Sequence, residues 1–392
     1  MTLFGSGKTT KAIAKKFGNA IFFEDIDKEF VDEEGFLHRP SDSFDPARSC
    51  LEIPSPGIPP HHPLIQKAQN LISEYDLFAS TMPYSIWISG TNGKTTTTQM
   101  IAHLLQDKGA IAGGNIGTPL AELDEKAPIW ILESSSFTLH YTRTAKPNLY
   151  VLLPITPDHI SWHGSFEAYE AAKLKPISRL QEGEVAIVPK KYAHIPSKGM
   201  VIGYESSEDL AGYFDLKKEL VKFQGAFLLD ALLALAVRKI LFFDTPYERI
   251  NDFFIDPHKQ EEFTDALGRV WVDDSKATNI DATIEAIKRY QTRKIYLILG
   301  GDNKGVSLEP LFAHIRDAKV YAIGKAADEI EALCKQYDIP CVKSYQLKNA
   351  VEAIKKELTK NEVALLSPAC ASLDQFRSYK ERGELFKQYI LS

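Results

Sequence analysis

The chain has few cysteines, no long apolar run and no excess of basic residues, and each shortage excludes a class of protein. Its four cysteines form no C-x-x-C pair and no zinc-type spacing, so we expect reduced, mostly buried thiols rather than a disulfide scaffold. The longest apolar stretch of note, Ala231 to Val237, is far too short to cross a bilayer. The first residues also lack the basic-then-apolar pattern of a secretion signal, so we expect a cytoplasmic protein with no membrane partner.

The charge balance gives no broad attraction to polyanions. Lysine and arginine number 46 against 52 aspartates and glutamates, which leaves a formal charge of -6 and argues against nucleic acid and anionic membranes as partners. Any phosphate on a ligand must therefore be bound by local features. The apolar share of 44% is ordinary for a globular protein, and 392 residues predict two or three domains.

Two breaks divide the chain into three predicted domains. Proline-rich stretches at 53–63 and 81–84 mark the first break, and a softer break falls at 253–262. We place an N-terminal domain at 1–81, a central domain at 82–256 and a C-terminal domain at 257–392. In the last domain the runs RVWVD, KIYLILG, KVYAIG, PCV and EVALLS alternate with helical segments. This alternation predicts parallel βαβ units and an α/β fold with a doubly wound sheet.

The strongest local motif is SGTNGKTTTT at 89–98, between a predicted strand at 84–89 and a helical pattern that runs to Leu105. Glycines let backbone N–H groups approach phosphate oxygens, and the helix start adds partial positive charge. In such loops Lys94 reaches the β and γ phosphates and Thr95 offers its hydroxyl to Mg²⁺. The strict pattern requires glycine where Ile88 stands, so this is a variant loop. Its setting favours nucleotide binding over a plain glycine-rich turn.

A second glycine-rich segment, FGSGKTTKAIA at 4–14, has the GKT letters but Thr2 where the first glycine belongs. Almost no chain precedes it, so we expect a short strand, a turn and a helix. The N-terminus of that helix could hold a diphosphate. An ordinary strand-to-helix turn remains the alternative.

Three segments of the central domain carry further chemical groups. Glu133 ends a predicted strand, where open α/β sheets place ligand groups, and one carboxylate near Thr95 suffices for Mg²⁺. A predicted helix with Ser165 as its N-cap and Pro176 as its stop carries Lys173. The loop after the next strand offers Asp158, His159 and His163. The two histidines could instead have a structural role, and Lys173 could be an ordinary solvated charge.

The C-terminal domain places three polar segments, 272–279, 299–305 and 365–376, after predicted parallel strands, and hence on one edge of one sheet. Ser372 and Gln375 also fit a capping box for the helix that follows, which does not exclude substrate contact. The set suits a small anionic substrate and comprises Asp274, Ser275, Lys276, Thr278, Asn279, Lys304 and Ser372.

The motifs SGTNGKTT, LESSSF, PDH with a downstream AAK, DDSKATN, GGDNKG and LLSPACASLDQF, in this order, resemble those of the Mur ligases. The last three look like those of the members that add D-glutamate, and the resemblance spans about 84–390. It implies an N-terminal Rossmann-like domain for a UDP-sugar, a central P-loop-type domain for ATP and a C-terminal Rossmann-like domain for the amino acid. The implied enzyme is an ATP-dependent acid–amino-acid ligase of cytoplasmic peptidoglycan synthesis. It joins D-glutamate to UDP-N-acetylmuramoyl-L-alanine through an acyl phosphate, and we expect a monomer.

The resemblance also assigns roles to individual residues. Lys94, Glu133, His159 and Lys173 match catalytic positions, with Lys173 carbamylated, and Thr95, Glu133, His159 and Lys173 match positions around two Mg²⁺ ions. The nucleotide set is Gly90, Thr91, Asn92, Gly93, Lys94, Thr95, Thr96, Asp230, Lys259, Asp274 and Lys276. Implied contacts to the UDP-sugar are Ser6, Gly7, Lys8, Thr9, Asp25 or Asp27, Ser55, Gly57, Asn115 and His159. Those to D-glutamate are Thr278, Lys304, Ser372, Leu373 and Tyr379.

The chain departs from the family pattern at several points. Where the family has G-x-H-N-x-x-N, segment 225–230 has apolar residues before Asp230, so recognition of adenine and ribose is expected to be rearranged. Lysine at 259 replaces the usual arginine, which exchanges a planar fork for a point charge. Tyr379 stands where phenylalanine is usual, and SWH replaces the common D-R-H or D-R-Y after His159.

Two other functions remain open from the sequence. A family member that adds a different amino acid, or glutamate to folate, shares the phosphate loop, but SPACAS with Thr278 and Lys304 favours D-glutamate. A regulator that binds nucleotide without ligation would be expected to have lost Glu133, Lys173 or Lys304. All three are present.

Overall fold

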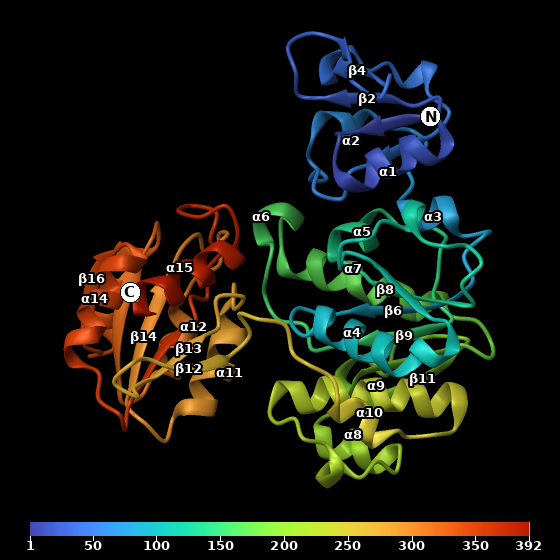
Figure 1. The fold of residues 1–392 in the computed structure, drawn as a ribbon. Coiled ribbons are helices and arrows are strands. Elements are labelled where there is room, and N and C mark those ends of the chain that lie inside the picture. Colours follow the sequence, from blue (N-terminus) through green and yellow to red (C-terminus); the bar gives the residue numbers. More distant parts are fainter. Residues whose placement is uncertain (392) are drawn as a thin grey trace. The chain divides into compact units, whose positions relative to one another are not determined.

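The computed structural model describes residues 1–391, and its ribbon is drawn in Figure 1. The chain forms three mainly parallel sheets with helices packed on them, as the α/β prediction requires. Its contacts group it into two compact units, one of residues 1–155 and 162–253 and the other of residues 156–161 and 254–392. The first unit holds two sheets and the second holds one. The predicted boundaries at 81 and 256 stay predictions.

The first sheet has the order β3-β4-β2-β1-β5. Its strands are β1 (Thr2–Phe4), β2 (Ile21–Glu24), β3 (Phe30–Val31), β4 (Leu37–Pro40) and β5 (Glu52–Pro54), and only β3 runs antiparallel to its neighbour. Helix α1 (Lys8–Phe17) follows β1 directly, which confirms the predicted short strand, turn and helix. Two short helices, α2 (Pro63–Lys67) and α3 (Glu74–Phe78), lead to the next sheet.

The central sheet has the order β11-β10-β9-β6-β8-β7 and is parallel throughout. Its strands are β6 (Tyr84–Ser89), β7 (Ile111–Gly114), β8 (Ile129–Glu133), β9 (Leu149–Leu152), β10 (Val185–Pro189) and β11 (Met200–Tyr204). The order reverses at β6, between β8 and β9, and such switch points bind ligands at the carboxyl ends of the strands. The accompanying helices are α4 (Lys94–Leu105), α5 (Ser136–Tyr141), α6 (Ile160–His163), α7 (Phe166–Arg179), α8 (Ser207–Tyr213), α9 (Ala226–Phe242) and α10 (Tyr247–Asn251).

The third sheet has the order β12-β13-β17-β14-β15-β16. The five predicted strands are confirmed as β13 (Val270–Asp273), β14 (Ile295–Gly300), β15 (Ala318–Ile323), β16 (Cys341–Tyr345) and β17 (Val363–Leu366). An antiparallel edge strand, β12 (Glu261–Thr264), was not predicted, because EEFT alternates in exposure without a clear apolar face. The helices are α11 (Ile280–Tyr290), α12 (Glu309–Phe312), α13 (Ala327–Gln336), α14 (Leu347–Glu357) and α15 (Tyr379–Leu391).

Three local predictions were wrong. Pro176 lies inside α7 rather than at its end, and α7 continues to Arg179. Ser372 caps no helix, since α15 begins only at Tyr379 and the backbone carbonyl of Ser372 accepts the N–H groups of Gln375 and Phe376 in a turn. The thiols are free, but Cys50 is exposed, so the expected burial holds fully for only two of the four.

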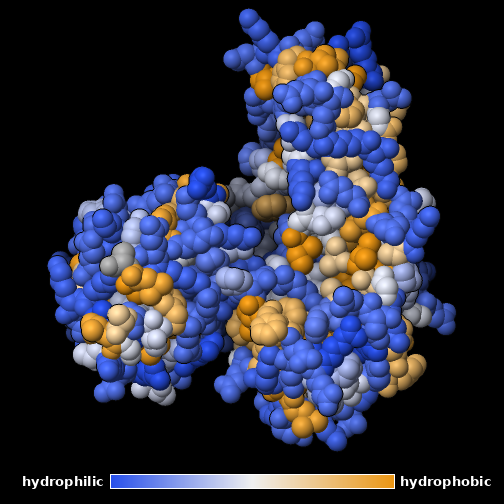
Figure 2. All heavy atoms as spheres, viewed as in Figure 1, coloured by the Kyte–Doolittle hydropathy of each residue, from blue (hydrophilic) through white to orange (hydrophobic). Residues whose placement is uncertain are grey.

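The cores lie on both faces of each sheet, beneath the helices. Trp87, Trp130 and Trp271 are completely buried within them. Figure 2 shows a mainly hydrophilic surface with scattered hydrophobic patches on the face in view. None of the helices in residues 1–391 is long and apolar enough to cross a membrane.

Gly300 offers a test of how β14 fits against β15. Its φ is +127°, and a β-carbon there would lie 2.0 Å from the carbonyl oxygen of Ile323. We expect Gly300→Ala to lower the free energy of unfolding by about 3 kcal/mol or more, because the obstructing atom is backbone and cannot move aside.

Gly268→Ala is the matched control, since Gly268 also has a positive φ (+70°) but meets only the end of the Lys360 side chain, at 3.6 Å. Here the cost should be about 1 kcal/mol, from the backbone conformation alone. Urea-induced unfolding measures both. Equal costs would show that the close approach of β15 is not what excludes a side chain at 300.

Candidate active site

The phosphate loop joins β6 to α4, and its glycines are required by close packing. Gly90 has φ +140°, and a β-carbon there would lie 2.5 Å from Cβ of Leu153. Gly93, at φ +80°, precedes the first residue of α4, and its β-carbon would meet the Asp230 carboxylate at 2.6 Å. The end of β9 therefore packs directly on the loop, and the backbone N–H groups at the start of α4 border the space next to it. Asn92 and Thr95 are half-buried there, whereas Thr96 is buried.

Two lysines point their ammonium groups at this loop. Lys94 Nζ donates hydrogen bonds to the carbonyl oxygens of Gly90, at 3.0 Å, and Thr91, at 2.7 Å. Lys173 comes from α7, is buried, and donates to the same Gly90 oxygen at 2.8 Å, with Ser89 Oγ at 3.4 Å. Tyr169, one turn earlier on α7, hydrogen-bonds the Thr91 hydroxyl at 3.0 Å. The solvated role left open for Lys173 is thereby excluded.

Glu133 lies at the carboxyl end of β8, beside β6, and is buried. Its Oε1 accepts a hydrogen bond from Asn115 Nδ2 at 2.7 Å, so two residues predicted for different ligands are in contact. Its Oε2 is buried and accepts no hydrogen bond from residues 1–391. A buried carboxylate oxygen without a partner costs free energy unless a ligand satisfies it. Glu133 Oε2 is suited to bind a divalent cation, since Mg²⁺ prefers carboxylate oxygen ligands.

Asp230 faces the loop from α9. It is buried, and its Oδ1 accepts a hydrogen bond from Thr97 Oγ1 on α4 at 3.0 Å. Segment 225–230 thus reaches the nucleotide loop through a carboxylate instead of neutral amides. The preceding side chains, from Ala226 to Leu229, leave no polar group on this first turn of α9.

The N-terminal loop forms a second candidate anion site in the same unit. Gly7 and Ser55 lie together, since a β-carbon at Gly7 would be 2.4 Å from Ser55 Oγ. Lys8 donates a hydrogen bond to the carbonyl oxygen of Gly117, in the loop that also holds Asn115, while Thr9 is half-buried beside it. The Gly57 carbonyl accepts a hydrogen bond from Trp162 Nε1 at 3.0 Å. This geometry brings together most of the residues predicted for the UDP-sugar.

Glu24 is a residue that the sequence analysis missed. It ends β2, and its Oε2 accepts the Ser6 N–H at 3.1 Å, so one N–H of the glycine-rich loop is already bound to an acid. The other oxygen contacts His38 Nδ1 at 2.5 Å, and Phe22 and Phe30 stack on the two faces of His38. A Rossmann pattern, with an acid at the end of the second strand, could have identified it.

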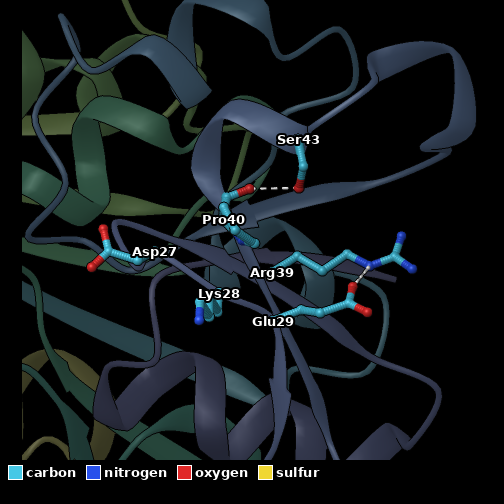
Figure 3. Close-up of a pocket in the computed structure, with 6 residues that line it drawn as sticks. All are labelled: Asp27, Lys28, Glu29, Arg39, Pro40 and Ser43. Atoms are coloured by element: carbon cyan, nitrogen blue, oxygen red, sulfur yellow. Dashed lines mark hydrogen bonds and ion pairs between the residues drawn. The ribbon is translucent and has the colours of Figure 1, made fainter.

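A pocket of about 550 Å³ lies beyond the ends of β2 and β4 (Figure 3). Asp27, Lys28, Glu29, Arg39, Pro40 and Ser43 line it, and Arg39 pairs with Glu29 at 3.4 Å. Asp25 is bound nearby to the Ser41 hydroxyl at 2.7 Å and to His62 Nε2 at 3.1 Å. The hydrogen bond from Ser41 is the main cause that lowers the pKa of Asp25. Asp25 and Asp27 were the alternatives predicted to contact the UDP-sugar, and of these Asp27 lines the pocket.

In the second unit the carboxyl ends of β13, β17 and β14 bring the three predicted polar segments together, as expected. Ser367 Oγ donates to Asp274 Oδ2 at 2.7 Å, and the Asp302 and Ala371 backbones exchange hydrogen bonds of 3.0 and 2.8 Å. Asn279 caps α11 by accepting the Ala282 N–H at 3.1 Å. Thr278 is half-buried, Ser372 buried and Leu373 73% exposed at this edge.

Lys304 follows β14 in a left-handed conformation (φ +54°) and donates a hydrogen bond to Asp158 Oδ1 at 2.7 Å. Burial raises the pKa of Asp158, but Lys304 and His159 outweigh it, so the net pKa is lowered. His159 also has a positive φ, of +52°, and its N–H donates to Asp158 Oδ1 at 2.8 Å. His159 and Asp158 belong to the second unit, whereas Glu133 and Lys173 belong to the first. His163, by contrast, is buried against the Ser136 hydroxyl at 3.0 Å in the first unit, a structural role.

The segment that enters the third sheet is tied to the polar edge. His258 Nδ1 contacts Asp273 Oδ2 at 2.6 Å, and its carbonyl oxygen accepts the Lys276 N–H at 3.1 Å. Lys259 lies next to it and pairs with Asp256 at 3.5 Å. Lys276 Nζ lies 5.6 Å from the centre of the Tyr379 ring, within range of a cation–π contact.

Comparisons with known proteins identify a single family. The sequence profile described as the Mur ligase middle domain matches residues 88–201. A protein of Campylobacter jejuni (strain 81-176) named UDP-N-acetylmuramoylalanine--D-glutamate ligase is 52% identical over 100% of this chain and 99% of its own length. A protein of the same name from Helicobacter pylori (strain J99) is 48% identical with the same coverage. The crystal structure of a MurF ligase from Thermotoga maritima in complex with ADP has a similar fold, with a TM-score of 0.61 at 17% identity over 95% and 94% of the two chains.

Asp274 gives the second unit a measurable pH dependence. Its burial raises the pKa of the carboxyl from 3.8 to about 8, so it is protonated in the folded protein at neutral pH. Between these values the folded state binds one more proton at this site than the unfolded state does. Raising the pH through that window therefore lowers the free energy of unfolding by about 1.4 kcal/mol per pH unit from this group.

Asp274→Asn removes the titration. From pH 5 to pH 7 we expect the variant to lose about 2 to 3 kcal/mol less of its unfolding free energy than the wild type, as measured by urea-induced unfolding. Asp317→Asn, at an exposed carboxylate in the same unit, is the control and should keep the wild-type dependence. Parallel curves for wild type and Asp274→Asn would refute a protonated Asp274.

Proposed function

The chain belongs to the Mur ligase family, and from this premise we propose that it joins D-glutamate to UDP-N-acetylmuramoyl-L-alanine at the expense of ATP. Identities of 48–52% over the whole chain to ligases named for this reaction carry the proposal. We further propose that it acts as a cytoplasmic monomer in the synthesis of peptidoglycan precursors. We assign phosphoryl transfer to residues of the first unit and binding of the amino acid to residues of the second unit.

The proposed reaction has two steps. A carboxylate oxygen of the UDP-sugar substrate attacks the γ-phosphorus of ATP, and ADP leaves. The amino group of D-glutamate then attacks the acyl carbon, an amide forms, and phosphate leaves with the carboxylate oxygen. Phosphoryl transfer depends on positioning and on neutralisation of charge rather than on covalent help from the protein. The first unit supplies both through Lys94 and the N–H groups at the start of α4.

Glu133 and Thr95 are the residues of the first unit proposed to hold Mg²⁺, and the buried, unpartnered Oε2 of Glu133 supports this. Bound there, the ion neutralises charge on the phosphate oxygens. Asn115 keeps the Glu133 carboxylate in place through its 2.7 Å hydrogen bond. His159 is proposed as a ligand of a second ion.

Lys173 is proposed to be carbamylated. The burial of its amine and its 2.8 Å hydrogen bond to the Gly90 carbonyl support a position at the phosphate loop. A carbamate keeps one N–H, which can go on donating to Gly90, and adds two anionic oxygens. The change would turn a buried cation into an anionic group suited to metal ions.

The amino-acid site is proposed at the polar edge of the third sheet, with Thr278, Lys304, Ser372, Leu373 and Tyr379. Joining one anion to another requires cations near the attacking group, and Lys304 and Lys276 supply them. In the first unit the loop at 6–9, with Ser55 and Gly57, is proposed to bind the diphosphate of the UDP-sugar. The pocket lined by Asp27 and Arg39 is proposed for its uridine.

The most direct test measures phosphate release with ATP, Mg²⁺ and UDP-N-acetylmuramoyl-L-alanine while the amino acid is varied. We expect turnover with D-glutamate and much less with L-glutamate, D-aspartate or meso-diaminopimelate, because the relatives at 48–52% identity are named for the addition of D-glutamate. Equal rates with all four, or none with D-glutamate, would contradict the proposal. Omission of the UDP-sugar is the control for plain ATP hydrolysis.

The role of Lys173 is tested by substitution and rescue. Lys173→Ala should lose at least about a hundredfold in kcat, as expected for loss of a group that acts in the transition state, and short carboxylates such as acetate should restore part of it by replacing the carbamate. Lys173→Arg, which keeps a cation but cannot form this carbamate, should be equally inactive.

Lys175→Ala, on the same helix, is the control, since Lys175 bonds the carbonyl oxygens of Leu139 and His140 and not the phosphate loop. It should keep its activity and show no response to acetate. Full activity of Lys173→Ala would refute the carbamate.

A further inference from the structure

Arg382 is a buried cation whose hydrogen bonds go to backbone carbonyls and a hydroxyl. It lies in the first turn of α15 with no exposed surface. Its Nε donates to Ser275 Oγ at 3.0 Å, and Nη2 donates to the Ser275 carbonyl oxygen at 2.8 Å. Nη1 and Nη2 both donate to the Cys370 carbonyl oxygen at 3.2 Å. Among residues 1–391, no carboxylate oxygen accepts a hydrogen bond from it.

This arrangement is costly for a side chain that only fills space. Burial of the guanidinium lowers the pKa of Arg382 to about 10, so it remains a cation at neutral pH in surroundings that disfavour charge. It also lies near the N-terminus of α15, where the helix dipole is unfavourable to a positive group. An apolar residue of similar size would avoid both costs. An apolar residue would not, however, supply the planar set of hydrogen-bond donors with which arginine reaches two chain segments at once.

The two segments that Arg382 joins are those that carry the predicted contacts to the amino acid. Ser275 lies three residues before Thr278, and Cys370 lies two residues before Ser372 and three before Leu373. The Ser275 hydroxyl also donates to the Tyr379 carbonyl oxygen at 2.8 Å, which ties the start of α15 to the same point. Beyond Cys370, the paired Ala371 and Asp302 backbones extend the connection toward Lys304.

The nucleotide side of the same edge has attachments of its own. Asp274 is held by Ser367 Oγ, by the Gln260 N–H at 3.2 Å and by the Leu366 carbonyl. The Lys276 N–H donates to the His258 carbonyl oxygen. None of these bonds involves Arg382, so Asp274 and the Lys276 backbone keep attachments of their own when Arg382 is replaced.

We propose that Arg382 is a positioning residue for the amino-acid substrate, because its fork of hydrogen bonds to Ser275 and Cys370 fixes the spacing between segments 275–278 and 370–373. The proposal rests on the proposed ligase function for the identity of that substrate. Arg382 itself touches no substrate in this account. Lysine cannot replace it, since a single ammonium cannot bond both carbonyls and the hydroxyl in the same plane.

Steady-state kinetics of Arg382→Lys test the proposal. We expect the KM for D-glutamate to rise at least about tenfold, with kcat within about threefold and the KM for ATP within about twofold of wild type. Arg382→Met, which also removes the charge, should behave like Arg382→Lys. Arg377→Lys is the matched control, since Arg377 is exposed and forms an ion pair with Glu381 on the surface, and it should match the wild type. An unchanged KM for D-glutamate in Arg382→Lys, or equal rises for D-glutamate and ATP, would overturn the proposal.

Ser275→Ala decides the matter if the arginine variants do not fold, as judged by thermal unfolding. It removes the hydroxyl that accepts from Arg382 Nε and donates to the Tyr379 carbonyl oxygen, while the bonds from Arg382 to the Ser275 and Cys370 carbonyls can remain. It should raise the KM for D-glutamate about threefold without change in the KM for ATP. No change would contradict the positioning role. Failure of the proposed function is seen separately, in the wild type: if it uses another amino acid, the same comparison of KM values is made with that amino acid.

Discussion

The hydrogen bond from Lys173 to the Gly90 carbonyl is the contact on which the candidate active site depends. It joins α7 to the phosphate loop inside the protein, beside the Tyr169–Thr91 bond. A β-carbon at Gly90 would clash, because Leu153, the residue after β9, fills the space where it would lie. The loop is thus held from two sides, and the carbonyls of Gly90 and Thr91 accept hydrogen bonds from lysine side chains. A change of charge at Lys173 would act on the loop directly.

The protein is acidic overall, yet backbone carbonyls and hydroxyls hold several of the cations at its candidate sites. Lys94, Lys173 and Arg382 bond backbone carbonyls or hydroxyls. Carbonyl oxygens hold a cation in place without cancelling its charge, so a net positive potential is left for anionic ligands. Lys304 and Lys259 differ, since Asp158 pairs with Lys304 at 2.7 Å and Asp256 pairs with Lys259 at 3.5 Å. The formal charge of -6 therefore says little about the sites themselves.

The fold was predictable wherever the residue pattern is local. Strand β6, helix α4 and the five parallel strands of the third sheet follow from apolar runs and turn residues, and their order in the sheets brings the predicted side chains to one edge. Edge strand β12 and the late start of α15 depend on tertiary packing, and Pro176 is tolerated in α7 because the helix is held by contacts elsewhere. Local propensity does not contain that information.

The sequence predicted which residues belong to the candidate site better than it predicted their contacts and protonation states. Sequence motifs identified Glu133, Lys173 and Asp274, but not that Glu133 leaves one oxygen without a partner or that Asp274 is protonated. Burial determines both properties. Arg382 was missed because it bonds backbone groups far along the chain, which no spacing rule records. Glu24 was missed although its place at the end of the second strand fits the Rossmann pattern.

The central proposal is that ligation passes through an acyl phosphate, and isotope transfer tests it most directly. The substrate carboxylate is labelled with ¹⁸O, and the phosphate released during ligation is examined by mass spectrometry. The account predicts one ¹⁸O atom in each phosphate, because a carboxylate oxygen becomes part of the phosphoryl group and leaves with it. Amide formation with unlabelled phosphate would contradict it.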